Sequence, residues 1–258
     1  GDISAKLIPP VWMERGNGEH PLGTDRFGRD VLSRVIYGSR ISLVVSLIAI
    51  GVAGTFGTAL GLISGYRGGL TDVFLMRLTD IALSLPIILI AVVMVAVTEP
   101  SFRNVVIVIA LLLWPRFARQ IRGETLAVKE QDFVALAVVA GRSSAWIISR
   151  HIFPNVVPTL LVVATLQVGY VILLEGTLSF LGVGVPPPSP AWGLMIRDGR
   201  GFLPTAWWIS LFPGLAMLLT VLAVNLMGDW LRDHLDPKLR QLGARAVLRE
   251  APAALVEP

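Results

Sequence analysis

The sequence predicts an all-α, polytopic membrane protein with about five transmembrane helices. Of its 258 residues, 54% are hydrophobic and 16% are charged, and the mean hydropathy is +0.71. Soluble domains carry about 25% charged residues, so a soluble chain of this composition would lack the polar surface to cover itself. Uncharged stretches about as long as a spanning helix cover residues 41–66, 81–98, 152–174 and 201–228.

Composition also excludes several kinds of site. The chain has no cysteine, which rules out disulfides, thiolate catalysis and cysteine-ligated metals. Its histidines, His20, His151 and His234, lie far apart in the sequence, so we expect no metal site. The formal net charge is +4, but the basic residues fall mostly between the spans. That distribution is typical of membrane topology, so we expect lipid and no nucleic acid as a partner.

The N-terminal residues 1–40 are polar and broken by prolines and glycines. We expect an extracytoplasmic lead-in here, with a helix from Asp30 to Leu43 lying along the membrane surface. The transmembrane domain then covers residues 41–228. Its first span, about residues 41–65, carries glycines at four-residue spacing: Gly57, Gly61 and Gly65. Small residues on one face let a neighbouring helix approach closely, so this span is predicted to lie in the middle of the bundle.

The next two spans contain residues that disturb an apolar helix. Pro86 lies inside the second span, about residues 79–98, and predicts a kink because proline removes a backbone donor. Asp80, near the end of this span, is expected to be interfacial. The third span, about residues 104–120, includes arginines spaced three apart: Arg116, Arg119 and Arg122. We expect these side chains to extend to the membrane interface.

The last two spans follow the longest polar break. The fourth covers about residues 155–182 and contains Glu175, and a proline-rich loop separates it from the fifth, about residues 205–228. Residues 229–258 form a charged tail. Loops on one side, including 123–151, hold most of the Lys and Arg of the connections, whereas the other side holds Arg103, Arg197 and Arg200. We therefore place the long loop and the tail in the cytoplasm.

The long loop has the signals of two short helices. Residues 130–140 are helix-forming, Gly141 is a good helix stop, and Ser143 or Ser144 can cap a second helix that ends before Pro154. Apolar residues recur along the first helix at helical spacing: Phe133, Val134, Ala137, Val138 and Gly141. This face covers either a protein partner or the underside of its own bundle, and the pattern leaves both open.

The segment FVALAVVAGRSSAWIISRHIFPN, from Phe133 to Asn155, resembles the EAA loop of ABC importer permeases. Positions that match the family's pattern are Gly141, Arg150, His151, Ile152, Pro154 and Asn155. Ala137 matches the second alanine of the Glu-Ala-Ala start, but Ala135 and Leu136 stand where the family has the glutamate and the first alanine. The resemblance therefore does not extend to the contacts of that glutamate.

Further segments resemble the second permease of dipeptide, oligopeptide and nickel importers. They are residues 20–43, 65–86, 172–196 and 228–240, in the family's order and spacing. The family has another spanning helix before the first of these segments, so we expect that the chain is truncated or that this member lacks that helix.

The resemblance implies a type I permease fold in the bacterial cytoplasmic membrane, with residues 123–155 as the coupling loop. The chain would pair with a homologous permease, form a path for di- or oligopeptides, and contact two ATP-binding subunits or domains and an extracytoplasmic substrate-binding protein. Nickel, haem or another small solute is the alternative cargo. No G-x-x-x-x-G-K-[ST] loop occurs in the sequence, so we expect no cofactor on this chain and no enzymatic activity, with ATP and Mg on the partner subunits.

Glu175 is the acid that lies deepest between apolar stretches. An unpaired carboxylate in hydrocarbon is costly, so Glu175 should line the path, face the partner permease or make a structural hydrogen bond. With Pro86 it forms our candidate set for the path or permease interface. One buried acid and no evident repeat disfavour a channel or secondary transporter. An intramembrane enzyme is disfavoured because Ser179 has no histidine near it in the sequence.

Overall fold

The computed structural model describes residues 3–235, and the rest of the predicted tail lies outside them. The longer helices are α1 (Val31–Arg67), α2 (Gly69–Ser84), α3 (Ile87–Thr98), α4 (Phe102–Lys129), α7 (Phe153–Leu181) and α9 (Trp208–Leu235). The shorter ones are α5 (Asp132–Val139), α6 (Ser144–Ile147) and α8 (Trp192–Gly199), with single turns at Ile3–Ala5, Ile148–Ile152 and Arg200–Phe202. No strand occurs within residues 3–235, which agrees with the predicted all-α class.

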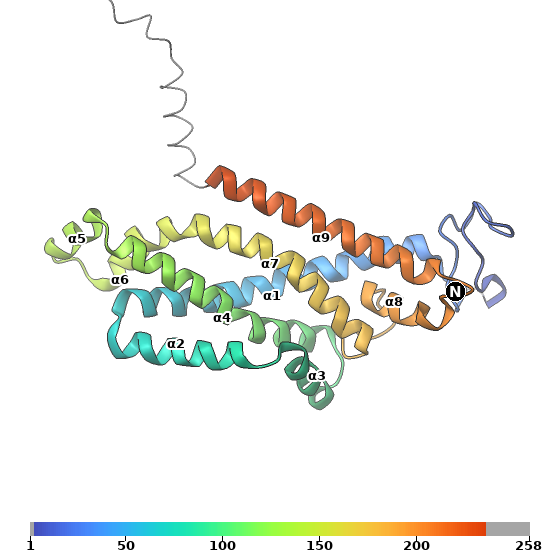
Figure 1. Cartoon of the computed structure of the whole chain (residues 1–258), viewed down its shortest axis with the longest axis horizontal. Coiled ribbons are helices and arrows are strands. Elements are labelled where there is room, and N and C mark those ends of the chain that lie inside the picture. The colour runs from blue at the N-terminus through green and yellow to red at the C-terminus, as the bar shows by residue number, and fades with distance from the viewer. Residues whose placement is uncertain (1–2, 236–258) are drawn as a thin grey trace, which may run out of the picture.

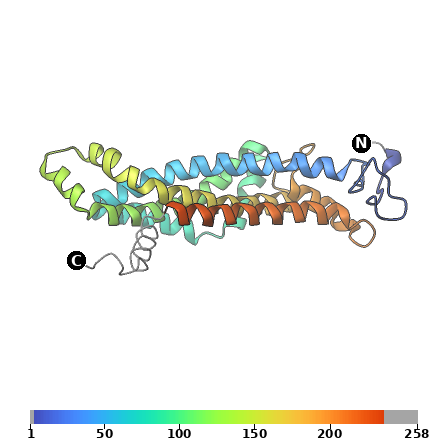
Figure 2. The same cartoon turned by 90° about the horizontal axis from the view of Figure 1, so that it is seen from above.

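The long helices run side by side along the longest axis of the molecule (Figure 1). α7 lies between α1 and α9, and α2 packs on α1 and α4 on the side away from α9 (Figures 1 and 2). The short helices α5 and α6 form one end of the bundle, and the N-terminal segment and α8 form the other. The core between α1, α4 and α7 consists of residues such as Val45, Ala49, Ile109, Leu113, Phe117, Val171 and Leu178.

The predicted number of spans is confirmed. Helical stretches 31–67, 102–129, 144–181 and 208–235 are long and apolar enough to cross a membrane. The pair formed by α2 and the first part of α3 makes a fifth if it counts as one span, bent by 83°. Pro86 is the residue before α3, so the predicted kink is confirmed and is a complete break in the helix.

The glycine row of α1 has the close helix neighbour that the sequence predicted, and that neighbour is α4. A Cβ atom on Gly57 would be 2.5 Å from the Trp114 carbonyl oxygen, and one on Gly61 would be 2.7 Å from that of Ala118. These distances are shorter than any normal van der Waals contact, so the two helices approach each other as closely as their backbones permit.

Several predicted helix ends were wrong. The expected surface helix from Asp30 to Leu43 is continuous with the first span: Asp30 caps α1 by accepting a hydrogen bond from the Ser33 backbone N–H (2.7 Å). α4 continues to Lys129 and α9 to Leu235, beyond the predicted ends of their spans. Charged residues ended the predicted spans, but a helix does not have to stop where it leaves the hydrocarbon.

The interfacial placement of the α4 arginines stays a prediction, but the structure gives them partners that the sequence did not reveal. Arg122 forms a two-point ion pair with Asp72 of α2, with Nη2 2.6 Å from Oδ2. Arg119 pairs with Asp80, which is thus part of a contact between α2 and α4. Arg116 faces α7, where its guanidinium lies 4.0 Å from the centre of the Tyr170 ring. These contacts depend on how α4 packs against α2 and α7, which residue spacing alone does not reveal.

Candidate functional site

At one end of the bundle, α5, residues 140–143 and α6 form a protrusion that we call the tip (Figure 1). Gly141 has φ +70°, a conformation that glycine adopts without strain. The Gly141 N–H donates to the Val138 carbonyl (3.0 Å) and the Arg142 N–H to that of Ala137 (3.2 Å). Ser143 caps α6 by accepting from the Trp146 N–H (3.3 Å). The predicted helix, glycine hinge and second helix are confirmed.

The two faces of α5 have different surroundings. Val134 and Ala137 are buried in an apolar cluster that also contains Leu62, Ile121, Ile147, Ile152 and Val156. The remaining apolar side chains are open to solvent: Phe133 is 39% exposed, Leu136 69%, Val138 56% and Val139 86%. Both explanations left open by the sequence therefore describe part of the helix, since one face covers its own bundle and the other is uncovered.

Ala135, at the position of the family's glutamate, is also exposed and lies on the uncovered side of α5. Arg150 is exposed in the turn that follows α6. His151 connects the two halves of the tip, because its ring centre lies 5.8 Å from that of Phe133 and 5.0 Å from that of Trp146. This aromatic group fixes α5 to the turn that leads into α7.

The second short helix does not end before Pro154, contrary to prediction. α6 continues through a π-helical turn, Ile148–Ile152, into α7. Pro154 lies in the first turn of α7, where a missing N–H is tolerated. The Asn155 side chain donates a hydrogen bond to the His151 carbonyl (2.6 Å), and this bond spans the junction between the π-helical turn and α7. The tip is thus joined to α7 by unbroken helical backbone.

A groove of about 730 Å³ lies beside the tip, between α4, α7 and α9. Its polar lining residues are Gln120, Glu124, Gln131, Asn155, Thr159 and Arg232. Phe133 and Asn155 are the predicted site residues that border it. The groove itself was missed by the sequence analysis, although the four-residue spacing of Arg116, Gln120 and Glu124 places them on one face of α4.

The other candidates, Glu175 and Pro86, lie away from this groove. Glu175 has no exposed surface, and its carboxylate accepts hydrogen bonds from Ser42 (3.1 Å) and Ser179 (2.6 Å). In this structure Glu175 of α7 is hydrogen-bonded to Ser42 of α1, so it makes the structural hydrogen bond that was one of its three predicted roles. Its side chain faces neither a groove nor an open surface. Pro86 is exposed at the break between α2 and α3. The proposed role of Pro86 in the path or permease interface stays a prediction.

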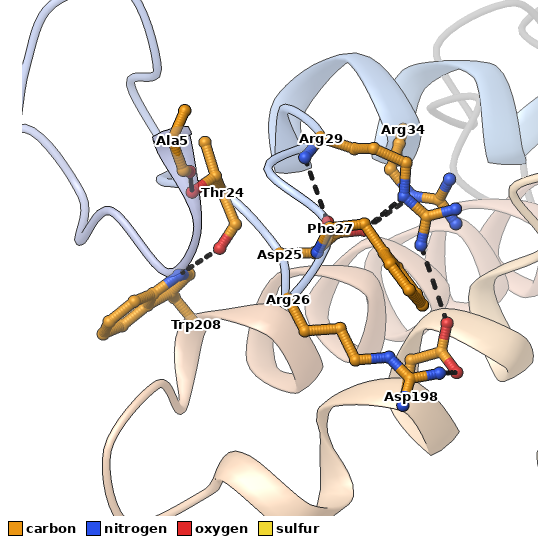
Figure 3. Close-up of polar contacts among 9 residues, drawn as sticks. All are labelled: Ala5, Thr24, Asp25, Arg26, Phe27, Arg29, Arg34, Asp198 and Trp208. Carbon is orange, nitrogen blue, oxygen red and sulfur yellow. Dashed lines mark hydrogen bonds and ion pairs between the residues drawn. The ribbon is translucent and has the colours of Figure 1, made fainter. Parts of the chain in front are cut away.

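At the opposite end of the bundle, residues 3–30 form a folded segment that packs on α8 and α9, which we call the cap (Figure 3). Asp25 is its centre: its carboxylate accepts from the backbone N–H groups of Phe27 (2.8 Å) and Arg29 (3.0 Å) and from Arg29 Nε (2.6 Å). Arg26 reaches Asp198 of α8, with Nη2 3.2 Å from Oδ1.

The cap is also fixed to α9 through a hydrogen-bonded chain. Trp208 donates from its indole N–H to the Thr24 carbonyl (3.1 Å), and the Thr24 hydroxyl donates to the Ala5 carbonyl (2.6 Å) (Figure 3). Phe27 is 47% exposed, and the guanidinium carbons of Arg26 and Arg29 lie 4.5 and 4.6 Å from its ring centre. The sequence analysis did not identify the cap, because its contacts join residues that are far apart in the chain.

Within residues 3–235, no group of three or more His, Asp or Glu side chains is placed to hold a metal ion. The tip, the groove and the cap offer exposed apolar side chains, hydrogen-bonding groups and charges.

Comparison with known proteins gives consistent results. Residues 57–241 match the family described as binding-protein-dependent transport system inner membrane component. The chain is 45% identical to the dipeptide transport system permease protein DppC of Haemophilus influenzae, over 92% of this chain and 81% of that protein. It is 47% identical to the Escherichia coli protein of the same description, over 92% and 79%.

Solved structures share the fold at low sequence identity. A chain of the MetNI methionine ABC transporter, described in inward-facing conformations, matches with a TM-score of 0.68 over 80% of this chain and 97% of that chain, at 14% identity. A chain of an amino acid ABC transporter matches with a TM-score of 0.61 over 79% and 94%, at 11% identity. Each of these matches covers about four fifths of this chain.

Proposed function

Because this chain belongs to the binding-protein-dependent transport system inner membrane component family, and is thus a multi-pass permease subunit of an ABC importer, we propose that its cargo is a di- or oligopeptide. The relatives named as dipeptide permeases cover most of the chain at 45% and 47% identity, and they support this cargo over nickel, haem or another small solute. The membrane is then the bacterial cytoplasmic membrane. The chain pairs with a homologous permease, and cargo reaches the pair from an extracytoplasmic binding protein.

The tip then lies in the cytoplasm and docks on an ATP-binding subunit, one of two that hold ATP and Mg. The exposed apolar side of α5 is the observation that supports this role, because Leu136 and Val139 are 69% and 86% exposed at the end of the bundle. Covering apolar side chains in that position removes them from water, which stabilises the complex with the partner.

The buried side of α5 connects the docking surface mechanically to the spanning helices. Val134 and Ala137 pack against Leu62 of α1 and Ile121 of α4, and the π-helical turn continues into α7. A movement of the docked tip therefore acts on three spanning helices together. Interiors this closely packed transmit displacement because they have little room to absorb it.

Co-purification of the assembled importer tests the docking. We expect Val139→Asp to remove most of the ATP-binding subunits from the purified complex, because the substitution places a charge in an apolar contact and leaves the buried side of α5 intact. Leu203→Asp is the matched control, since Leu203 is 50% exposed near the opposite end of the bundle. Normal recovery of ATP-binding subunits with Val139→Asp would contradict docking through α5.

Uptake into proteoliposomes tests the cargo. We expect ATP-dependent accumulation of a radiolabelled dipeptide by the complete importer with its binding protein. Accumulation of nickel or haem with no dipeptide uptake would replace the peptide proposal and leave the family assignment intact.

A further inference from the structure

A row of polar side chains follows the face of α4 that is next to α7. Arg116, Gln120 and Glu124 lie four residues apart, so their side chains follow one another along the helix. Gln120 and Glu124 line the groove beside the tip, and Arg116 lies one turn further into the bundle, midway along α4. The row therefore extends from the open groove to the middle of α4, inside the predicted third span.

Arg116 has contacts with α7 that hold it without neutralising its charge. Its guanidinium lies over the Tyr170 ring at 4.0 Å, and its Nη1 lies 3.5 Å from Gln167 Oε1, at the outer limit of a hydrogen bond. Tyr170 and Gln167 are both neutral. Arg119 and Arg122 on the same helix have aspartate partners, but the ion pairs found across residues 3–235 include none with Arg116.

A cation in this position is expensive unless something else stabilises it. Ionisable groups inside a span mark substrate pathways or pair with another group, because hydrocarbon does not solvate charge. At the mouth of the groove, Glu124 and Arg232 contribute charges of opposite sign. Arg116 is then the uncompensated cation at the deep end of the row.

We propose that Arg116 binds the terminal carboxylate of the peptide cargo as it passes along the face that α4 and α7 share, an inference that rests on the proposed peptide importer. A guanidinium matches a carboxylate with two parallel N–H bonds, and stacking on an aromatic ring leaves its N–H edge available. A terminal carboxylate is common to all unmodified peptides, so one arginine serves cargo of any side-chain sequence. Tyr170 and Gln167 stabilise the vacant arginine, which keeps the binding weak enough for release.

The first test compares variants in proteoliposomes that contain the complete importer and saturating loaded binding protein. We expect Arg116→Gln to lower dipeptide uptake per ATP hydrolysed about tenfold, the effect of losing one charge-assisted interaction. Arg116→Lys should recover a large part of the uptake because it restores the charge. Arg103→Gln, an exposed arginine near the start of the same helix, is the matched control and should behave as wild type.

The ATPase activity stimulated by loaded binding protein should remain close to wild type in all three variants. Unchanged uptake per ATP with Arg116→Gln would overturn the proposal. Loss of assembly or of stimulated ATPase in step with uptake would also overturn it, since Arg116 would then be structural or pair with an acid of the second permease. A wild-type importer that takes up another cargo and no dipeptide would show instead that the peptide function is wrong.

The second test identifies the group that Arg116 recognises. Purified complex without binding protein is mixed with a dipeptide that carries a photoreactive diazirine side chain, either with a free carboxylate or as the C-terminal amide. We expect the carboxylate form to label α4 and α7 about tenfold more than the amide, and Arg116→Gln to abolish that difference. Equal labelling by the two forms, or no labelling of these helices, would contradict carboxylate binding.

Discussion

Gly61 of α1 lies so close to α4 that a methyl group has no room. A Cβ atom there would be 2.7 Å from the Ala118 carbonyl oxygen and 2.9 Å from Ile121 Cβ, and a backbone atom cannot move aside cheaply. We expect Gly61→Ala to lower the free energy of unfolding by about 1–3 kcal/mol through overpacking. Thermal unfolding of the purified importer measures the change.

The control for this prediction is on the same helix. Apart from its own helical turn, Gly51 has no atom within 4 Å of the place its Cβ would take, so Gly51→Ala should be neutral or stabilising because alanine is the better helix former. If both substitutions shift the Tm alike, close approach of α1 and α4 is not what Gly61 provides.

Glu175 is a second residue whose surroundings predict a measurable effect. Its carboxylate accepts from Ser42 and Ser179, and glutamine retains one accepting oxygen, so Glu175→Gln should cost about 1–3 kcal/mol of stability. Uptake per folded importer should be nearly unchanged. Wild-type stability with a large loss of uptake would instead place Glu175 in the path, as the sequence also allowed.

The α5 helix depends on the backbone conformation of the hinge that follows it. Gly141 has φ +70°, which a residue with a Cβ adopts only with strain and proline cannot adopt. We expect Gly141→Ala to cost about 1 kcal/mol locally and Gly141→Pro to remove stimulated ATPase activity while the chain still inserts. ATPase assays of the assembled importer and membrane fractionation measure the two effects.

Gly123→Ala provides the matched comparison, because Gly123 and Gly141 both have open space around the added methyl group. Gly141 differs in having a positive φ. Stimulated ATPase activity that survives Gly141→Pro would show that the orientation of α5 does not control coupling.

At the scale of elements, the sequence located the helices better than their ends and their contacts. Uncharged stretches and Pro86 predicted the spans and the broken one, and Gly141 with Ser143 predicted the tip. The pairs Arg122–Asp72 and Arg119–Asp80 were missed, since they form between helices whose relative rotation is set by packing. The groove and the cap were missed for the same reason: each is made by residues brought together only in the folded bundle.

The two ends of the molecule are connected through α1, which has 37 residues and a length of about 55 Å at 1.5 Å per residue. That exceeds the roughly 40–45 Å of a bilayer with its headgroups, so one helix reaches both sides. Arg34 near its start lies against Asp25 of the cap (3.7 Å), and Leu62 near its end packs under α5. In the proposed importer, α1 therefore joins the side that receives the binding protein to the side that docks the ATP-binding subunits.

Loosening the cap should consequently weaken the response to the binding protein and leave the docking of the ATP-binding subunits intact. Asp25 is buried, and it is the carboxylate that Arg29 and Arg34 share and the acceptor of two backbone N–H groups. Removing it leaves those two donors unpaired and weakens the hold on both arginines, although Arg29 also lies 3.8 Å from Asp198. We expect Asp25→Ala to reduce the stimulation of ATPase activity by loaded binding protein several-fold, with basal ATPase activity and recovery of ATP-binding subunits unchanged.

Glu14→Ala, which changes an exposed acid of the same segment, is the control and should leave the stimulation intact. Full stimulation with Asp25→Ala would mean that the binding protein does not require an ordered cap, and a loss of ATP-binding subunits would mean that the cap supports the whole bundle.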